Sequence, residues 1–243
     1  MGCASGTRQF RIAIDGPAGA GKTTLATLLA KTLGFSHINT GMIYRALSYV
    51  LMERFPERSI QELESDIRKE DAKILEVIKG FSPNITENSF VADGKNIIHE
   101  LRTPRIDAVV GIISKYKIVR EKVKIIQKKL INMCPMAVVE GRDIGSAIMP
   151  DAELKIYLEA SVEERAIRRE KERSEKKDRG EQTPISLEEI EMKIKQRDFL
   201  DTTREISPLV KSPDAIVIDN TKLTVEETVK KIQDIFLQRQ QKD

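Results

Sequence analysis

The stretch from residue 10 to residue 25 reads Phe10-Arg-Ile-Ala-Ile-Asp-Gly-Pro-Ala-Gly-Ala-Gly-Lys-Thr-Thr-Leu25. It opens on a short apolar run, Phe10 to Ile14, which predicts a buried strand, and it continues into a turn rich in glycine. From Lys22 to Leu33 leucines recur at intervals of three and four, which is the spacing of an amphipathic helix, and a glycine then ends the pattern. The order strand, glycine turn, helix follows from these residues.

The glycine turn matches the phosphate-binding pattern G-x-x-x-x-G-K-[ST] at every fixed position. Glycines allow backbone N–H groups to close around phosphate oxygens, and the helix N-terminus adds a positive partial charge. We expect Lys22 to reach the β and γ phosphates of ATP and the Thr23 hydroxyl to bind Mg²⁺. The predicted ATP site consists of Gly16, Pro17, Ala18, Gly19, Ala20, Gly21, Lys22, Thr23 and Thr24.

Four further apolar runs predict buried strands, and helical patterns separate them along the chain. They are Phe35 to Ile38, Met136 to Val139, Leu154 to Leu158 and Ala215 to Ile218. Alternating strands and helices produce a parallel sheet, so we expect an α/β P-loop fold of three layers with a five-stranded parallel sheet. Capping boxes predict three helix starts, at Ser161 with Glu164, Ser186 with Glu189, and Thr224 with Glu227.

Two stretches depart from this alternation. An Asp93-Gly94 pair between β-capable flanks predicts a hairpin inside a small β insertion. Residues 170–184 contain no large apolar side chain and mix arginines with acids, which predicts a charged segment that is mobile in the free protein. The alternative is a solvated helical face with ion pairs such as Glu164 with Arg168.

We expect one domain over residues 10–243, preceded by a disordered leader at residues 1–9. Its core is predicted at about residues 10–58, 101–160 and 205–243, and the insertion at about 59–100 interrupts it. A charged helical lid is predicted at about residues 161–185, and a helix that lines the substrate site at about 186–204.

The composition argues against nucleic-acid and membrane partners. The chain has 41 basic and 38 acidic side chains, a net charge of +3 and no tryptophan, so a basic field and stacking platforms are both weak. No apolar run approaches the roughly 18 residues of a membrane span, and the first residues lack the apolar segment of a signal peptide. The two cysteines form neither a metal spacing nor a disulfide framework. We therefore expect a cytoplasmic protein.

Other residues must identify the phosphate acceptor, because kinases, GTPases and motor ATPases share the P-loop. The sequence has no Asn-Lys-x-Asp for guanine and no D-x-x-G switch signal, which argues against a GTPase. Arg45 and Arg142 instead follow predicted strands, where open parallel sheets bind ligands. The helix from Ser186 continues its apolar stripe with Arg197, Asp201 and Arg204, which predicts a polar cleft.

These arginines predict a phosphate clamp opposite the P-loop, formed by Arg45, Arg142, Arg197 and Arg204. Such a pair of sites suits phosphoryl transfer, which depends on positioning and charge neutralisation. His37 and His99 are interpreted as structural. Two alternatives stay open: a kinase for AMP, UMP or a non-nucleotide acceptor, and an ATP-binding interaction module or nucleic-acid binder that uses the basic lid.

Five motifs, in this order, resemble those of the bacterial-type cytidylate kinases, a P-loop nucleoside monophosphate kinase family, from about Phe10 to Leu237. They are Ile12 to Lys22, Thr40 to Arg45, Leu101 to Thr103, Glu140 to Gly145 and Arg197 to Arg204. The resemblance implies Mg²⁺-dependent transfer of phosphate from ATP to CMP and dCMP in pyrimidine nucleotide metabolism, by a cytoplasmic monomer. The family commonly has Gly, Ser and Asp where this chain has Thr24, Thr40 and Glu140.

The resemblance also implies the roles of individual residues, and it assigns the β insertion to the NMP-binding region. Four residues take catalytic roles: Lys22, Arg142, Arg197 and Arg168. The residues implied around CMP are Thr40, Tyr44, Arg45, Arg102, Arg142, Asp143, Arg197, Asp201 and Arg204. The arginines implied in the closing lid are Arg165, Arg168, Arg169 and Arg173.

Overall fold

The computed structural model describes residues 9–86, 89–177 and 185–241 of the chain. Two compact units are present, one made of residues 1–38 and 134–243 and the other of residues 39–133. Residues 1–8 of the predicted leader and residues 178–184 of the predicted lid lie outside the described residues. Among the helices described, none combines the length and the hydropathy that a membrane crossing requires.

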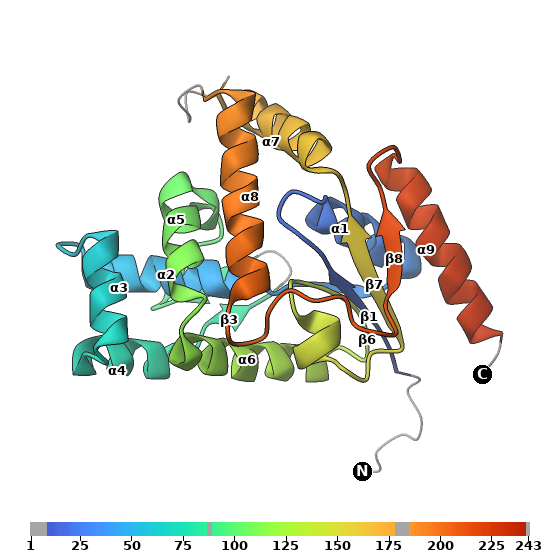
Figure 1. Cartoon of the computed structure of the whole chain (residues 1–243). Coiled ribbons are helices and arrows are strands. Elements are labelled where there is room, and N and C mark those ends of the chain that lie inside the picture. The colour runs from blue at the N-terminus through green and yellow to red at the C-terminus, as the bar shows by residue number, and fades with distance from the viewer. Residues whose placement is uncertain (1–8, 87–88, 178–184, 242–243) are drawn as a thin grey trace, which may run out of the picture. The chain divides into compact units, whose positions relative to one another are not determined.

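A five-stranded parallel sheet forms the centre of the first unit (Figure 1). Its strand order is β2-β6-β1-β7-β8, so β1 lies in the middle and pairs with both β6 and β7. This sheet confirms the predicted fold class, and each strand bound differs from its prediction by at most one residue. The strands are β1 (Phe10–Asp15), β2 (Ser36–Asn39), β6 (Met136–Glu140), β7 (Leu154–Glu159) and β8 (Ile216–Asp219).

Two helices cover one face of this sheet, α1 (Lys22–Leu33) and α9 (Val225–Gln240). Ile12 and Ile14 of β1 point to that face and pack with apolar residues of both helices. Successive side chains of a strand point to opposite faces, so Asp15, the last residue of β1, points away from this core. The strand therefore delivers a carboxylate to the other face of the sheet, directly before the glycine turn.

Helices α7 (Val162–Lys177) and α8 (Leu187–Thr203) pack against each other through an apolar cluster that contains Ala166, Ile190 and Ile194. Two of the predicted capping boxes, at Ser186 and at Thr224, are complete, because both reciprocal hydrogen bonds are present. The predicted charged stretch is helical as far as Lys177.

The predicted capping box at Ser161 is wrong in one of its two hydrogen bonds. Ser161 Oγ accepts the Glu164 N–H at 3.1 Å, but the Ser161 N–H donates to Thr221 Oγ1 at 2.9 Å instead of to Glu164. The turn after β8 thus supplies the acceptor that the box would have supplied. The Glu164 carboxylate accepts from Arg168 Nε at 2.8 Å, which is the helical ion pair that the sequence suggested.

The second unit is mainly helical and has its own apolar core. Its hairpin is confirmed: β4 (Phe90–Ala92) and β5 (Lys95–Asn96) are antiparallel, and β3 (Asn84–Ile85) pairs with β4. Asp93 and Gly94 have φ of 48° and 76°, as a two-residue type I′ turn requires. The helices of this unit are α2 (Gly41–Arg54), α3 (Ile60–Arg68), α4 (Ala72–Gly80), the short 3₁₀ helix η1 (Glu100–Arg102), α5 (Pro104–Ile113) and α6 (Lys117–Asn132).

Candidate active site

The three glycines of the loop between β1 and α1 all have a positive φ, and two of them show why glycine is needed there. Gly16 has a φ of 152°, and a Cβ atom there would lie 2.2 Å from the carbonyl oxygen of Leu158 on β7. Gly21, the N-cap of α1, has a φ of 83°, in the region that strains other residues. The loop thus passes against β7 and ends at a helix N-terminus, whose first N–H groups have no partner within the helix.

Lys22 folds back across the loop that precedes it. Its Nζ atom donates to the carbonyl oxygens of Gly16 and Pro17, at 2.8 and 2.7 Å, and the side chain is buried. Burial, followed by the positive charge of Arg142, holds the pKa of Lys22 well below its ordinary value. Three carboxylates act on this pKa in the opposite direction, those of Glu140, Asp201 and Asp15.

Asp15 is a buried carboxylate at the end of β1. Its Oδ1 and Oδ2 atoms accept the N–H groups of Ile144 and Gly145 at 2.8 and 2.7 Å. These residues begin η2 (Ile144–Ile148), a short π-helix. Burial raises the pKa of Asp15 to about 6, although both hydrogen bonds oppose the shift. The sequence gives one signal for this residue, its place directly before Gly16.

The raised pKa of Asp15 predicts a pH-dependent contribution to stability. Between pH values of about 4 and 6, the folded protein keeps a proton on Asp15 that the unfolded chain has lost. The contribution of Asp15 to the free energy of unfolding is therefore largest below a pH of about 4 and is lost as the pH rises through about 6. Between pH values of about 4.5 and 7, the free energy of unfolding of the wild type should fall by about 2 kcal/mol relative to Asp15→Asn. Urea unfolding of both proteins measures this, and a pH-independent difference would contradict the prediction.

Glu140, the last residue of β6, lies beside the start of α1. Its Oε2 atom accepts the hydroxyl hydrogen of Thr23 at 3.0 Å, and its Oε1 atom lies 3.1 Å from His37 Nε2. Hydroxyl and carboxylate oxygens suit Mg²⁺, which takes few protein ligands and completes its shell with phosphate oxygens and water. No cluster of three or more metal-ligating His, Cys, Asp or Glu occurs in the described part of the chain. The donor set therefore fits a metal bound mainly by its nucleotide.

Three arginines donate hydrogen bonds to one carboxylate of α8, and one of them, Arg204, is the C-cap of that helix. Asp201 is buried, and it accepts from Arg142 Nε at 3.0 Å, from Arg197 Nε at 3.4 Å and from Arg204 Nη1 at 3.4 Å. Burial raises the pKa of Asp201, but the three guanidinium groups together hold it below its usual range. The charged stripe that the sequence places on this helix is therefore a compact, mostly buried cluster.

Asp143 joins the same cluster from the β6 side. It follows Arg142 directly, is buried, and its Oδ1 atom lies 3.6 Å from Arg204 Nη2. The charge of Arg142 also acts on Lys22 of the loop. Five of the residues assigned to CMP thus come together in the first unit: Arg142, Asp143, Arg197, Asp201 and Arg204.

Arg165 of α7 contacts the loop itself. Its Nη1 atom donates to the carbonyl oxygen of Ala18 at 2.9 Å and forms an ion pair with Asp198 of α8. Asp198 in turn accepts the Ala18 N–H at 3.1 Å. Both polar groups of one loop residue are therefore held by α7 and α8. No sequence pattern marks Asp198 as a contact of the loop, and its one signal is its place one helical turn after the buried Ile194.

Arg168 reaches the turn after β8. Its guanidinium donates to the side-chain and backbone oxygens of Asn220, at 3.1 and 2.8 Å, and Asn220 Nδ2 donates to the carbonyl oxygen of Ala20 at 3.1 Å. Asn220, which no sequence motif marks, thus links α7 to the P-loop. Arg169 instead pairs with Glu172 at 3.2 Å on an exposed face, and Arg173 follows one turn further along α7.

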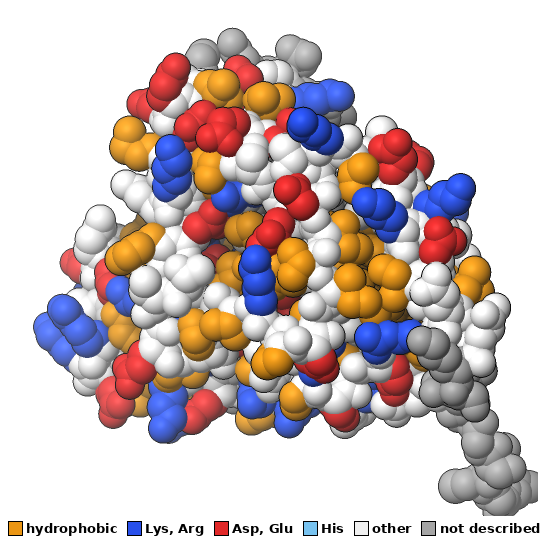
Figure 2. Space-filling view, turned by 45° about the vertical axis from the view of Figure 1, so that its right-hand side comes forward, with side chains coloured by type: hydrophobic (Ala, Val, Ile, Leu, Met, Phe, Trp, Pro, Cys, Tyr) orange, Lys and Arg blue, Asp and Glu red, His pale blue; other side chains and the backbone are white. Residues whose placement is uncertain are grey.

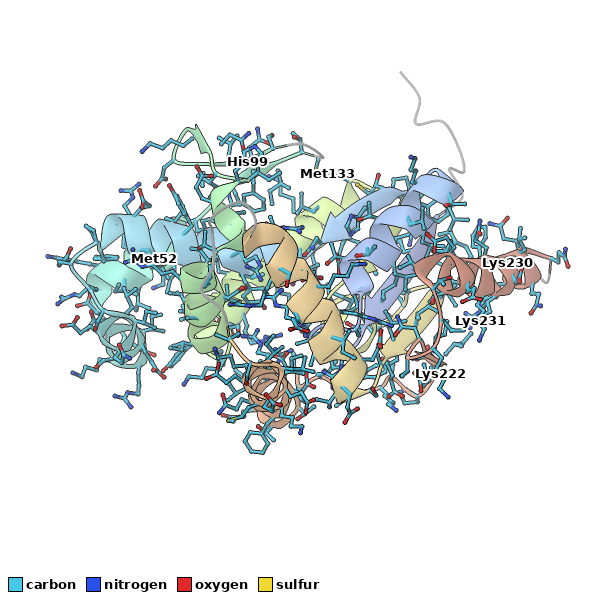
Figure 3. All side chains as sticks on the ribbon, turned by 90° about the horizontal axis from the view of Figure 1, so that it is seen from above. Met52, His99, Met133, Lys222, Lys230 and Lys231 are labelled. Atoms are coloured by element: carbon cyan, nitrogen blue, oxygen red, sulfur yellow. The ribbon has the colours of Figure 1, made fainter. Side chains whose placement is uncertain are left out.

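The second unit brings together the remaining residues assigned to CMP. Arg45 of α2 donates to the carbonyl oxygen of Leu101 at 2.9 Å and pairs with Asp107 of α5, so it lies next to Arg102 in the chain fold. Tyr44 is buried, and the Arg120 guanidinium lies 5.8 Å from its ring centroid. Thr40 is the buried N-cap of α2, Arg102 is exposed at the end of η1, and His99 precedes η1 (Figure 3).

The parallel sheet, the glycine loop with its lysine and the neighbouring arginine cluster define the protein as a P-loop phosphotransferase. The family model described as cytidylate kinase matches residues 12–238. A cytidylate kinase of Enterococcus faecalis is 42% identical over 95% of this chain and 97% of its own length. Another, of Thermosipho africanus, is 44% identical over 94% of this chain and 95% of its own. The chain belongs to the cytidylate kinase family.

Proposed function

We propose that the protein transfers the γ-phosphate of ATP to CMP, and also to dCMP, giving ADP and CDP or dCDP. The observation that carries this proposal is the arrangement inside the first unit, where α8, which bears the Asp201 cluster, also contacts the P-loop through Asp198, the acceptor of the Ala18 N–H at 3.1 Å. Groups that bind a donor phosphate and groups that bind an acceptor phosphate then act on the same transferred group. Membership of the cytidylate kinase family supports CMP as the acceptor.

The residues of the chain contribute positioning and charge. The loop N–H groups and the N-terminus of α1 hold the ATP phosphates, while Lys22 exchanges its two carbonyl acceptors for phosphate oxygens. Arg142 and Arg197 neutralise charge that spreads over the transferred group, and Arg168 supports this from the lid. Mg²⁺, when bound with ATP, neutralises phosphate oxygens, and Thr23 would hold it with Glu140 beside it.

CMP would bind through its phosphate and its base. Arg204, with Arg142 and Arg197, offers guanidinium groups for the monophosphate. Four residues of the second unit are further proposed ligands of CMP, namely Thr40, Tyr44, Arg45 and Arg102. Arg165 and Arg168 contact the P-loop and its neighbours, so we keep them with Arg169 and Arg173 as the proposed lid.

We further propose that the protein acts as a cytoplasmic monomer without a nucleic-acid or membrane partner. The face in Figure 2 intersperses basic and acidic side chains, in keeping with the near balance of charges in the sequence. Lys222, Lys230 and Lys231 lie on α9 or just before it (Figure 3), and the same helix carries Glu226 and Glu227 in its first turn. Acids thus dilute the basic side chains of this region.

A substrate panel tests the proposed function. Coupled assays with ATP and, in parallel, CMP, dCMP, AMP, UMP and GMP should give the highest kcat/KM for CMP or dCMP. A kcat/KM for AMP or UMP at least equal to that for CMP would overturn CMP as the proposed phosphate acceptor. Salt-sensitive binding of an oligonucleotide together with no phosphoryl transfer would instead support a nucleic-acid binder.

Asp143→Asn is predicted to lower the preference for CMP over UMP. Cytosine presents an N4 amino donor where uracil presents an O4 acceptor, so a carboxylate attracts the first and repels the second. An amide can serve both bases, and the ratio of kcat/KM for CMP to that for UMP should fall by about 10-fold or more. Discrimination equal to that of the wild type would remove Asp143 from base recognition.

A further inference from the structure

His37 and Glu140 form a contact beside the P-loop, although the sequence suggests only a structural role for His37. His37 lies on β2, and Glu140 ends the adjacent strand β6. Their Nε2 and Oε1 atoms are 3.1 Å apart, and the imidazole Nε2–H is the donor because a carboxylate oxygen accepts. The Glu140 side chain is 4% exposed and the His37 side chain 23%, so the contact is largely shielded from water.

Both nitrogens of the imidazole are connected to Thr23 through hydrogen-bond contacts. Through Nε2 the path runs to Glu140, whose other carboxylate oxygen accepts the Thr23 hydroxyl hydrogen at 3.0 Å. Through Nδ1 it runs to Thr27 Oγ1 at 3.3 Å, and Thr27 Oγ1 lies 2.8 Å from the backbone oxygen of Thr23. The ring therefore braces the first turn of α1, where the P-loop ends.

The carboxylate oxygen that faces Thr23, Glu140 Oε2, determines the direction of the Thr23 hydroxyl hydrogen. A glutamate carboxylate rotates about several bonds, so a single orientation requires a partner that holds it. A hydroxyl that donates its hydrogen to Glu140 directs its oxygen lone pairs away from that carboxylate, which is the orientation that a cation ligand needs. When Glu140 is held in one orientation, the Thr23 oxygen is therefore already oriented to bind a cation.

We propose that His37 is a positioning residue for the metal of the nucleotide. It fixes the Glu140 carboxylate, which orients the Thr23 hydroxyl, and it thereby raises the affinity for the metal–ATP complex. The proposal rests on the proposed function in taking ATP with a divalent cation as the donor substrate. Partners that orient metal ligands typically change metal affinity about 10- to 100-fold when removed.

The matched pair His37→Gln and His37→Asn separates the two ring nitrogens. The amide nitrogen of glutamine can take the place of the histidine Nε2 and donate to Glu140, whereas that of asparagine takes the place of Nδ1 and stays with Thr27. We expect His37→Gln to resemble the wild type. His37→Asn should weaken binding of the Mn²⁺–ATP complex about 10- to 100-fold. Its binding of ATP in EDTA should be unchanged.

Binding is measured on the full-length protein without an acceptor nucleotide. The two methods are calorimetry and the decrease of the electron paramagnetic resonance signal of free Mn²⁺. Equal Mn²⁺–ATP affinities for the Gln and Asn variants would overturn the proposal. So would an equal loss of affinity with and without metal, since a merely structural role predicts that result. If His37→Asn does not fold, Thr27→Val, which keeps the Glu140 contact, should bind Mn²⁺–ATP like the wild type, and a 10-fold loss there would also overturn it.

This experiment is independent of the acceptor. A negative substrate panel with a positive metal result would remove CMP phosphorylation and leave His37 as a metal-positioning residue. The Mg²⁺ concentration for half-maximal rate adds a kinetic readout, and it should rise for His37→Asn while the KM for CMP stays constant. In a Glu140→Gln background, the same His37 substitution should have little further effect, because the path to Thr23 is already interrupted.

Discussion

Replacing Lys22 by alanine should lower kcat by about 1,000-fold, or about 4 kcal/mol of transition-state stabilisation. The ammonium group lies across the loop against the Gly16 and Pro17 oxygens, where it can transfer to phosphate oxygens as charge develops on them. The loop backbone, set by its glycines, stays in place. The KM for CMP should therefore change much less than kcat.

Lys31→Ala is the matched control for this prediction. Lys31 lies in the last turn of the same helix, is exposed, and carries the same charge. Its replacement should leave kcat close to the wild-type value. Circular dichroism and thermal unfolding of Lys22→Ala should show the wild-type fold. The variant loses two hydrogen bonds of about 1 kcal/mol each, but it also no longer buries a charge, and the two effects oppose each other. A Lys22→Ala enzyme that retains a tenth of the wild-type kcat would contradict the role of this lysine.

Local patterns explain why so much of the fold could be predicted. The five strands, the glycine turn and the Asp93-Gly94 hairpin each depend on a few consecutive residues whose backbone preferences agree with the tertiary structure. The stripe on α8 has the same origin, because a helix places residues three and four apart on one face. It predicted that Arg197 and Asp201 would lie together, and they form an ion pair at 3.4 Å.

Partner choice between distant residues could not be predicted in the same way. Asp198 accepts the N–H of Ala18, and the Thr221 hydroxyl replaces Glu164 as the acceptor of the Ser161 N–H. Both results depend on how α7, α8 and the β8 turn meet beside the loop, which no periodicity encodes. No motif predicted the contact of His37 for the same reason, since its partner Glu140 lies 103 residues away in the sequence.

Asp201→Asn should produce the largest loss of stability among these variants. The change removes the one carboxylate that contacts all three of Arg142, Arg197 and Arg204. Asp143 beside Arg204 then remains as the other carboxylate of the cluster, so the positive charges repel one another more strongly around a buried position. Removing one partner of a buried ion pair costs about 3 kcal/mol or more. In a chain of this length, this corresponds to a fall in Tm of about 6 to 12 °C.

The same change should alter the response to anions, which distinguishes a charge effect from a packing effect. Inorganic phosphate can replace the missing carboxylate charge among the three guanidinium groups, so it should raise the Tm of Asp201→Asn more than that of the wild type. Asp234→Asn, an exposed carboxylate on α9, serves as the control and should match the wild type with and without phosphate. The KM for CMP should rise about 10-fold in Asp201→Asn, because the arginines lose the carboxylate that orients them. A variant with the Tm and KM of Asp234→Asn would show that Asp201 does not organise these arginines.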